Sequence, residues 1–329
     1  MFKILSIDGG GIRGVIPAFW LGEMERRIGR PLHECFDLVV GTSTGSILAA
    51  GIAAGIEVER LLDLYVADGD KIFPPRGYSR KLSLLEMLTS PKYSEEPLAD
   101  VLQRNFSDRG SLLKLRDLQT KCVVISYDVR KRSPAIFRSW HPDHEDLEVW
   151  GVCKGSCSAP TYFPAHVLTV AGVECPLVDG GIVANNPASL AVATAIQLKQ
   201  QDDLSAFEAA QDLFLVSLGT GNLTESITIE NARTWGSIQW AFPMLDVLFD
   251  AASAADDFVC EAILKRSAYV RMQVDLKAAS EELDEASASN ISDLKADASR
   301  YLDSSDGAAH MERIIHELSQ DRNAGESEA

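Results

Sequence analysis

Residues 38–48 read L-V-V-G-T-S-T-G-S-I-L and join an apolar run of strand character to a stretch of small apolar residues typical of a buried helix. The turn between them, residues 41–45, has the pattern G-x-S-x-G. In this context the serine stands exposed at the end of a strand, and its strained backbone needs glycine on both sides. The stretch therefore predicts an α/β fold and makes Ser43 a candidate nucleophile, with Gly41 and Gly45 supporting the turn.

Apolar runs recur along the chain, with helical patterns between them. Strand signals fall at residues 2–7, 36–40, 121–127, 135–138 and 213–217, and helical patterns at 14–28, 45–56, 187–200 and 307–318. Several of the runs are continuously apolar, as expected for central parallel strands covered on both faces. The alternation predicts a three-layer α/β/α sandwich around a mostly parallel central sheet.

A chain of 329 residues is long enough for one large α/β domain with additional elements. We expect a main domain over residues 1–225 and a helical C-terminal extension over 226–329 that packs on it. The acidic end of the extension is predicted to be disordered. The stretch 73–93, with three prolines, suits an amphipathic element that either packs on the core or forms a lipid-facing flap.

The net charge and the hydropathy exclude several classes of protein. The formal net charge is −17, which disfavours nucleic acid as a general partner, because a phosphate backbone rewards clustered Lys and Arg. No run approaches the roughly 18 apolar residues of a membrane-spanning helix, and the chain passes from Met1 directly into a strand. We therefore expect a cytoplasmic protein without a leader segment. Because no cluster has the spacing of metal ligands, we expect no metal and no cofactor.

A nucleophilic serine needs a base that takes its proton. His310 and His316 follow the chain order of a standard α/β-hydrolase, but they lie beyond an acidic, poorly patterned segment where rigid positioning is not expected. A carboxylate that acts directly is the alternative. Asp179 ends a short apolar run, and Gly180 and Gly181 behind it allow close approach. Such a carboxylate has to lie about 2.6–3.2 Å from the serine oxygen and be shielded from water, which raises its basicity.

A glycine-rich loop follows the first predicted strand. Residues 8–14 read D-G-G-G-I-R-G, and from Gly9 to Gly14 they satisfy G-x-G-x-x-G, the dinucleotide-binding pattern. A dinucleotide fold also needs an acidic residue at the end of its second strand, whereas Glu34 and Asp37 come before that strand or at its start. The loop amides therefore hold either a cofactor's pyrophosphate or the oxyanion of a reaction intermediate.

The motifs at residues 8–14, 41–45 and 179–181, in that order, resemble those of the patatin-like phospholipase family. Further agreement is found at 155–164, 185–187 and 217–221, so that the resemblance covers about residues 2–221. It implies the patatin-like fold and a catalytic domain over 1–225. It also implies a serine lipid acyl hydrolase that meets phospholipid at a membrane surface.

The resemblance assigns roles to single residues. Ser43 would be the nucleophile and Asp179 its general base, in a dyad without histidine. The oxyanion hole would be formed by the glycine-rich loop, at Gly9, Gly10, Gly11 and Arg13. An acyl-enzyme would form and be hydrolysed without a metal. Two alternatives stay open: a nucleotide-binding protein that uses the glycine-rich loop, and a serine esterase that acts on soluble esters.

A narrower resemblance concerns regulation. Residues 4–18 and the run to residues 70–73 look like bacterial patatin-type effectors of anti-phage defence, which are switched on by cyclic nucleotide second messengers. This implies a cyclic dinucleotide as an activator, although no motif marks its site. Apart from this resemblance, we expect the contact with the membrane to be peripheral, and the oligomeric state stays open.

Overall fold

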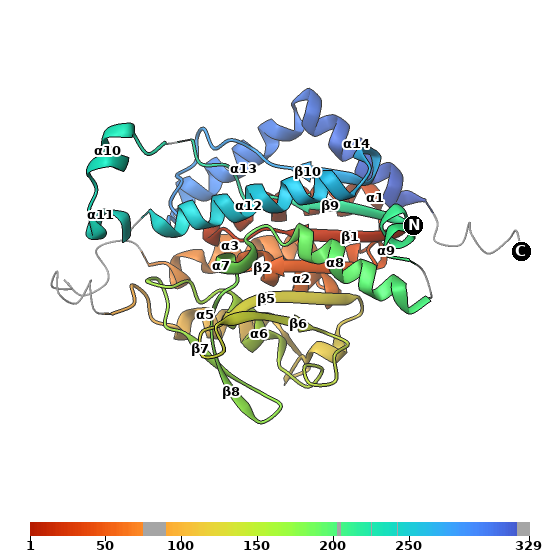
Figure 1. The fold of residues 1–329 in the computed structure, drawn as a ribbon, viewed down its shortest axis with the longest axis horizontal. Helices are drawn as coiled ribbons and strands as arrows, with labels where there is room; N and C mark the ends of the chain where they lie inside the picture. The colour runs from red at the N-terminus through yellow and green to blue at the C-terminus, as the bar shows by residue number, and fades with distance from the viewer. Residues whose placement is uncertain (75–89, 203–204, 225, 242, 321–329) are drawn as a thin grey trace, which may run out of the picture.

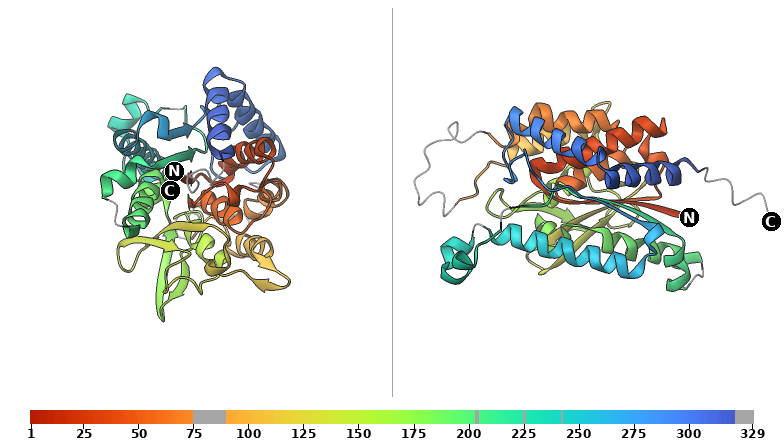
Figure 2. Two further views of the ribbon diagram at one scale, coloured as in Figure 1. Left: turned by 90° about the vertical axis from the view of Figure 1, so that its right-hand side faces the viewer. Right: turned by 90° about the horizontal axis from the view of Figure 1, so that it is seen from above.

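The computed structural model describes residues 1–74, 90–202, 205–224, 226–241 and 243–320 (Figure 1). Within these ranges a central sheet lies between two helical layers, which the view from above separates clearly (Figure 2). The three-layer α/β/α sandwich predicted from the sequence is therefore confirmed. The described ranges contain no helix with both the length and the apolar composition needed to cross a bilayer.

The central sheet has eight strands among the described residues, in the order β10-β9-β1-β2-β5-β8-β7, with β6 paired to β5. Their bounds are β1 (Phe2–Ile7), β2 (Leu38–Thr42), β5 (Lys121–Asp128), β6 (Ser133–Arg138), β7 (His166–Val170), β8 (Val173–Asp179), β9 (Leu213–Leu218) and β10 (Tyr269–Met272). The five strands from β10 to β5 run parallel to one another, whereas β6 and β8 run antiparallel to β5. A separate two-stranded sheet consists of β3 (Ser107–Asp108) and β4 (Ser111–Leu112).

The helices cover both faces of the sheet. Their bounds are α1 (Val15–Ile28), α2 (Thr44–Ala53), α3 (Val58–Ile72), α5 (Glu96–Asn105), α6 (Val149–Ser156), α7 (Gly181–Ala184), α8 (Ala188–Lys199), α9 (Ala206–Gln211), α10 (Ile229–Thr234), α11 (Ser237–Ala241), α12 (Met244–Ile263), α13 (Ala288–Leu302) and α14 (Ser305–Ser319). Strand β2 shows how the layers are separated. Val39 packs in the core under α1, α2 and α13, whereas Leu38 and Val40 pack on the opposite face against α8 and α12.

The five predicted strands all lie in the central sheet. Three further strands of this sheet were not predicted: β7 and β8, which form a hairpin, and β10 at the opposite edge. Strand β10 lies in the region expected to be a helical extension, so that region also contributes to the central sheet. The predicted amphipathic element at 73–93 falls mainly on residues 75–89, which lie outside the described residues, as does the tail at 321–329.

Candidate active site

Ser43 lies on the sharp turn between β2 and α2. Its backbone has a φ of +51°, in the left-handed region, and the residue is 8% exposed. A Cβ atom added to Gly41 would overlap the carbonyl oxygen of Gly45, and one added to Gly45 would overlap the carbonyl oxygen of Ile7. The two glycines therefore let α2 begin against the ends of β1 and β2, as G-x-S-x-G predicts.

The register of the sheet brings Asp179 beside this turn. Thr42 at the end of β2 pairs with Ile125 of β5, and Asp179 at the end of β8 pairs with the next residue of β5, Ser126. Because Gly180 has no side chain, the end of β8 can lie against the carbonyl oxygen of Ile125. Two strands that flank β5 therefore end at the same level and present a hydroxyl and a carboxylate to each other.

The two candidate side chains are in direct contact. The Ser43 hydroxyl donates a hydrogen bond of 2.6 Å to Oδ2 of Asp179, and the backbone N–H of Gly181 donates one of 2.7 Å to Oδ1. Both oxygens of the carboxylate are thus fixed in position. The separation lies in the range in which an aspartate can take a serine proton directly.

Burial sets the basicity of this carboxylate. Asp179 is 1% exposed, and this loss of solvation raises its pKa from 3.8 to about 6, while the hydrogen bonds from Ser43 and Gly181 act in the opposite direction. Loss of water penalises the charged form of a carboxyl group more than these two donors stabilise it. Asp179 is therefore a stronger base than an exposed aspartate, and remains ionised near neutral pH.

A second serine holds the turn from behind. The N–H of Ser43 donates to Oγ of Ser156 at 2.8 Å, and that hydroxyl in turn donates to the carbonyl oxygen of Ile125 at 2.5 Å. No role was predicted for Ser156 from the sequence. Its place in the segment 155–164, which resembles the family, was the available signal. The end of α6 is thereby tied to the turn that carries Ser43.

The glycine-rich loop lies next to Ser43, but its amides differ in availability. The N–H of Gly9 donates to the carbonyl oxygen of Asn185 at 2.9 Å. It is therefore not free for an oxyanion, contrary to the expectation. Within the part of the chain that the structure describes, the N–H groups of Gly10 and Gly11 have no hydrogen-bond acceptor. Both residues line the cavity that contains Ser43 and Asp179.

Arg13 supports the loop from behind and does not line this cavity. The residue is 5% exposed, and its Nε donates a long hydrogen bond of 3.4 Å to the carbonyl oxygen of Gly10. Burial lowers the pKa of the guanidinium, and the carboxylates of Asp246 and Asp250 on α12 partly offset this. Gly14 lies against the Thr44 hydroxyl, so the start of α1 packs closely on the start of α2.

An apolar cavity opens on the Ser43 hydroxyl. Its walls come from α2, α3, α5 and α12 and from two segments between elements, at Ile47, Leu64, Leu98, Phe249, Phe163 and Leu283. Phe249 belongs to α12 and Leu283 to the segment before α13. The C-terminal third of the chain thus forms part of this wall.

The two histidines considered as alternative bases lie on α14. His310 contacts the hydroxyl of Tyr301 at 2.8 Å, and His316 contacts the side chain of Gln320 at 3.0 Å. Neither lines the cavity with Ser43. Among the described residues there is also no group of three or more His, Cys, Asp or Glu side chains arranged to hold a metal ion.

An α/β/α sandwich with a serine on a strand–helix turn beside a buried carboxylate is the architecture of a serine hydrolase. Comparison with known proteins defines the chain further. The family model described as patatin-like phospholipase matches residues 5–192. The chain belongs to the patatin-like phospholipase family, a class of lipid acyl hydrolases that cleave carboxylic esters.

Individual relatives agree with this family over most of the chain. The chain is 31% identical to "Probable inactive patatin-3-Kuras 1" of Solanum tuberosum, with 88% of this chain and 83% of that protein covered. It is 33% identical to "Patatin-like protein 2" of Arabidopsis thaliana, with 84% and 76% covered. Among solved structures, VipD from Legionella pneumophila aligns with a TM-score of 0.43 at 13% identity, covering 92% of this chain and 66% of VipD.

Proposed function

We propose that the protein is a phospholipase of the A type that cleaves the acyl esters of membrane phospholipid with Ser43 as nucleophile and Asp179 as its base. The observation that carries the proposal is the 2.6 Å hydrogen bond from the Ser43 hydroxyl to the buried Asp179 carboxylate. A carboxylate with its pKa raised by burial can take the proton without an intervening histidine. Family membership supports the ester as the bond that is cleaved.

The reaction has two halves. Asp179 takes the hydroxyl proton as Ser43 Oγ bonds to the ester carbonyl carbon, and the N–H groups of Gly10 and Gly11 stabilise the resulting oxyanion. When the intermediate collapses, the carbon–oxygen bond to the glycerol side breaks, and Asp179 returns its proton to the leaving alcohol. In the second half Asp179 takes a proton from water as the water oxygen bonds to the acyl carbon. When the bond from that carbon to Ser43 Oγ breaks, Asp179 returns the proton to Oγ and the fatty acid leaves.

The apolar wall around Ser43 supports a lipid substrate. A fatty acyl chain offers only apolar surface, and burying it is favoured by about 0.8 kcal/mol for each CH₂ group. The side chains of Leu64, Leu98 and Phe163 suit such a chain and offer no polar group to a nucleotide. We therefore favour a lipid ester over both a soluble ester and a nucleotide ligand.

The proposal is tested by labelling and by lipid release. A fluorophosphonate probe is expected to modify the protein once, at Ser43, as located by peptide mass spectrometry. Incubation with phosphatidylcholine vesicles is expected to release free fatty acid, and prior labelling should stop that release. Modification at another serine, or fatty acid release that continues after full labelling, would exclude Ser43 as the nucleophile.

The pocket end of α12 is the surface that we propose for contact with the lipid. At this end of the helix three apolar residues are about 40% exposed: Met244, Val247 and Leu248. The residue that follows them, Phe249, lines the cavity. The apolar surface is thus continuous with the wall that would take the acyl chain. Exposed apolar patches next to a ligand cavity commonly mark a lipid or protein contact.

Leu248→Glu is therefore expected to weaken binding to phosphatidylcholine vesicles by about tenfold or more, since an inserted leucine contributes about 1.5–3 kcal/mol. Hydrolysis of a monomeric short-chain ester should not change. Phe258→Glu is the matched control, because Phe258 is 73% exposed on the same helix but lies about 15 Å further along it. Equal losses of vesicle binding in a sedimentation assay for both variants would contradict the assignment of the contact to the pocket end.

We also propose cyclic nucleotide activation, as in bacterial anti-phage effectors; its support is the resemblance of residues 4–18 to those proteins. Addition of a panel of cyclic dinucleotides to the vesicle assay is expected to raise fatty acid release at least tenfold for one member. The Ser43→Ala variant should show no response. Release that is already full without any nucleotide, and unchanged by all of them, would remove this part of the proposal.

A further inference from the structure

Strand β10, at one edge of the sheet, carries one charged side chain that is largely shielded from solvent, Arg271. It lies outside the residues matched by the family model and pairs in parallel with β9, with Arg271 opposite Ser217. The Arg271 side chain is 15% exposed, although an arginine is almost never buried unless it is paired. Its partner lies at the other end of the chain.

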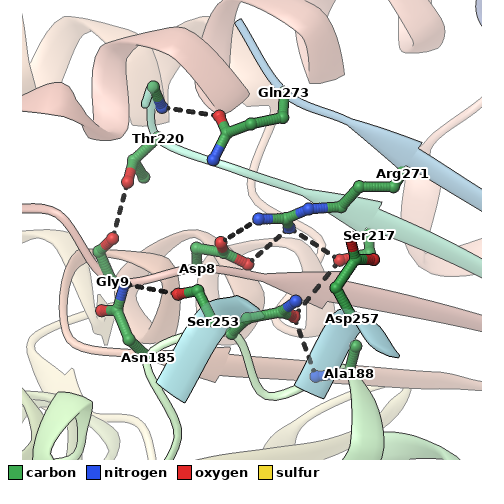
Figure 3. A network of polar contacts seen from close by, with 12 residues as sticks. Asp8, Gly9, Asn185, Ala188, Ser217, Thr220, Ser253, Asp257, Arg271 and Gln273 are labelled. Carbon is green, nitrogen blue, oxygen red and sulfur yellow. Dashed lines mark hydrogen bonds and ion pairs between the residues drawn. The ribbon is translucent and has the colours of Figure 1, made fainter. Parts of the chain in front are cut away.

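That partner is Asp8, the residue that begins the glycine-rich loop. Nη1 of Arg271 donates to Oδ1 of Asp8 at 2.9 Å, and Nη2 donates to Oδ2 at 2.6 Å (Figure 3). Nη1 also donates to the hydroxyl of Ser217 at 2.8 Å. The planar guanidinium thus holds both carboxylate oxygens at once, which fixes the direction of the carboxylate as well as its distance.

The Asp8 side chain depends on this contact. Asp8 is 1% exposed, and burial raises its pKa, while Arg271 is the principal group that lowers it. Without Arg271 the carboxylate would be left without its charge partner inside the protein, where an uncompensated charge is strongly unfavourable. It would then take up a proton or move toward solvent, and the loop attached to it would move as well.

The rest of the loop is held by Thr220, which follows β9, and by the segment that follows β10. Thr220 donates to the carbonyl oxygen of Gly9 at 2.6 Å, and Gln273 accepts from the N–H of Gly221, next to Thr220, at 2.8 Å (Figure 3). On the other side of the loop, the N–H of Ile12 donates to the carbonyl oxygen of Leu283 at 2.9 Å. Contacts from residues 271–283 therefore lie on both sides of Gly10 and Gly11.

We propose that Arg271 is a positioning residue: by fixing the Asp8 carboxylate, it aims the N–H groups of Gly10 and Gly11 at the oxyanion that forms on the Ser43-bound carbonyl. The proposal rests on the proposed serine hydrolase mechanism. Arg271 itself does not line the cavity that contains Ser43. Its effect passes through Asp8 to two backbone donors that act in the transition state, so it should alter kcat rather than KM.

The test compares Arg271→Met and Arg271→Lys with Lys199→Met. Lys199 is a matched control because its side chain is also 15% exposed and it pairs with Asp212 at 2.7 Å, just before the opposite end of β9. Each rate is divided by the number of sites that a fluorophosphonate labels at completion. Loss of folded protein therefore does not lower the value of kcat obtained. We expect kcat to fall about 100-fold in Arg271→Met, the size of losing one oxyanion donor, with KM within twofold.

Arg271→Lys is expected to have a kcat about tenfold higher than Arg271→Met and about tenfold lower than wild type, since an ammonium keeps the charge but cannot hold both oxygens. Lys199→Met should stay within twofold of wild type. If kcat per labelled site in both Arg271 variants matches Lys199→Met, the proposal is overturned. Where Arg271→Met fails to fold, Arg271→Lys carries the test with an expected tenfold loss.

A second measurement separates this proposal from the hydrolase mechanism. Amide hydrogen exchange in the peptide spanning residues 8–14 is expected to be faster in Arg271→Met and in Arg271→Lys, and unchanged in Lys199→Met. This readout does not depend on the reaction. If wild type is not labelled at Ser43, the mechanism fails while exchange still reports on the loop, and unaltered exchange in both Arg271 variants would overturn the positioning role alone.

Discussion

Replacing Ser43 with alanine is expected to lower fatty acid release from phosphatidylcholine vesicles by at least about 10⁴-fold, because losses of this order or larger follow removal of the nucleophile from a serine hydrolase. The substitution removes one oxygen atom from a residue that is 8% exposed. It leaves the Gly181 N–H bond to Asp179 in place. The fold should therefore survive, and the loss should appear in kcat with vesicle binding unchanged.

Ser158→Ala is the matched control for this prediction. Ser158 is a buried serine whose hydroxyl donates to the carbonyl oxygen of Lys154 at 2.9 Å and whose own carbonyl accepts the N–H of Asp179. Its removal tests whether any buried hydroxyl near the carboxylate matters. Activity of Ser158→Ala is expected to stay within about threefold of wild type. A Ser43→Ala protein that keeps a tenth of the wild-type rate would refute the proposed nucleophile.

The sequence predicted the parts of the site that local motifs carry. G-x-S-x-G marks a turn that is partly determined by its own residues, since a side chain at Gly41 would overlap Gly45 of the same turn, whereas one at Gly45 would overlap the end of β1. The contact of Ser43 with Asp179 was expected from the resemblance rather than from spacing. In the structure it depends on both residues flanking β5 at the same level, a register that the motifs alone do not encode.

What the sequence did not predict depends on contacts between distant residues. The carbonyl oxygen of Asn185 accepts the N–H of Gly9 and so removes this amide of the glycine-rich loop from the candidates for the oxyanion hole. Strand β10 has four residues and a central Arg271, so it lacks the apolar run of a buried strand. The pairing of that arginine with Asp8 compensates its charge, and no local pattern reveals the partner.

The hairpin of β7 and β8 was missed for a different reason. Residues of β7 alternate between half-buried and exposed, and β8 contains Glu174 and Pro176. Proline removes a backbone donor and is confined to sheet edges or the beginnings of strands. Strand β7 is the edge strand, and β8 pairs with β5 only over residues 177–179, so Pro176 lies where β7 is the one strand paired with β8 among the described residues. Only the last residues of β8, toward Asp179, carried an apolar signal.

Asp179→Asn is expected to lower kcat by about 10³- to 10⁴-fold, because an amide cannot take the proton of Ser43. In wild type, kcat/KM should fall tenfold for each pH unit below about 6, the pKa to which burial raises Asp179, and be level above it. The residual rate of Asp179→Asn should not show this dependence. A wild-type profile that is flat down to pH 4 would contradict Asp179 as the base.

The same substitution is expected to stabilise the fold, in a way that depends on pH. The Asp179 pKa is about 6 in the folded protein against an ordinary value of 3.8, so the folded state binds this proton more tightly than the unfolded chain does. Stability of wild type is therefore lost as pH rises from about 4 to 6, and a shift of about two units corresponds to about 3 kcal/mol. Asparagine carries no charge at any of these pH values and keeps an oxygen that accepts the Gly181 N–H.

Urea unfolding is therefore expected to show a higher free energy of unfolding for Asp179→Asn than for wild type, by up to about 3 kcal/mol at pH 8 and by about half as much at pH 5. If Asp179→Asn and wild type were equally stable at pH 8, burial of the charged carboxylate would not destabilise the fold. The carboxylate would then not be a stronger base than an exposed aspartate.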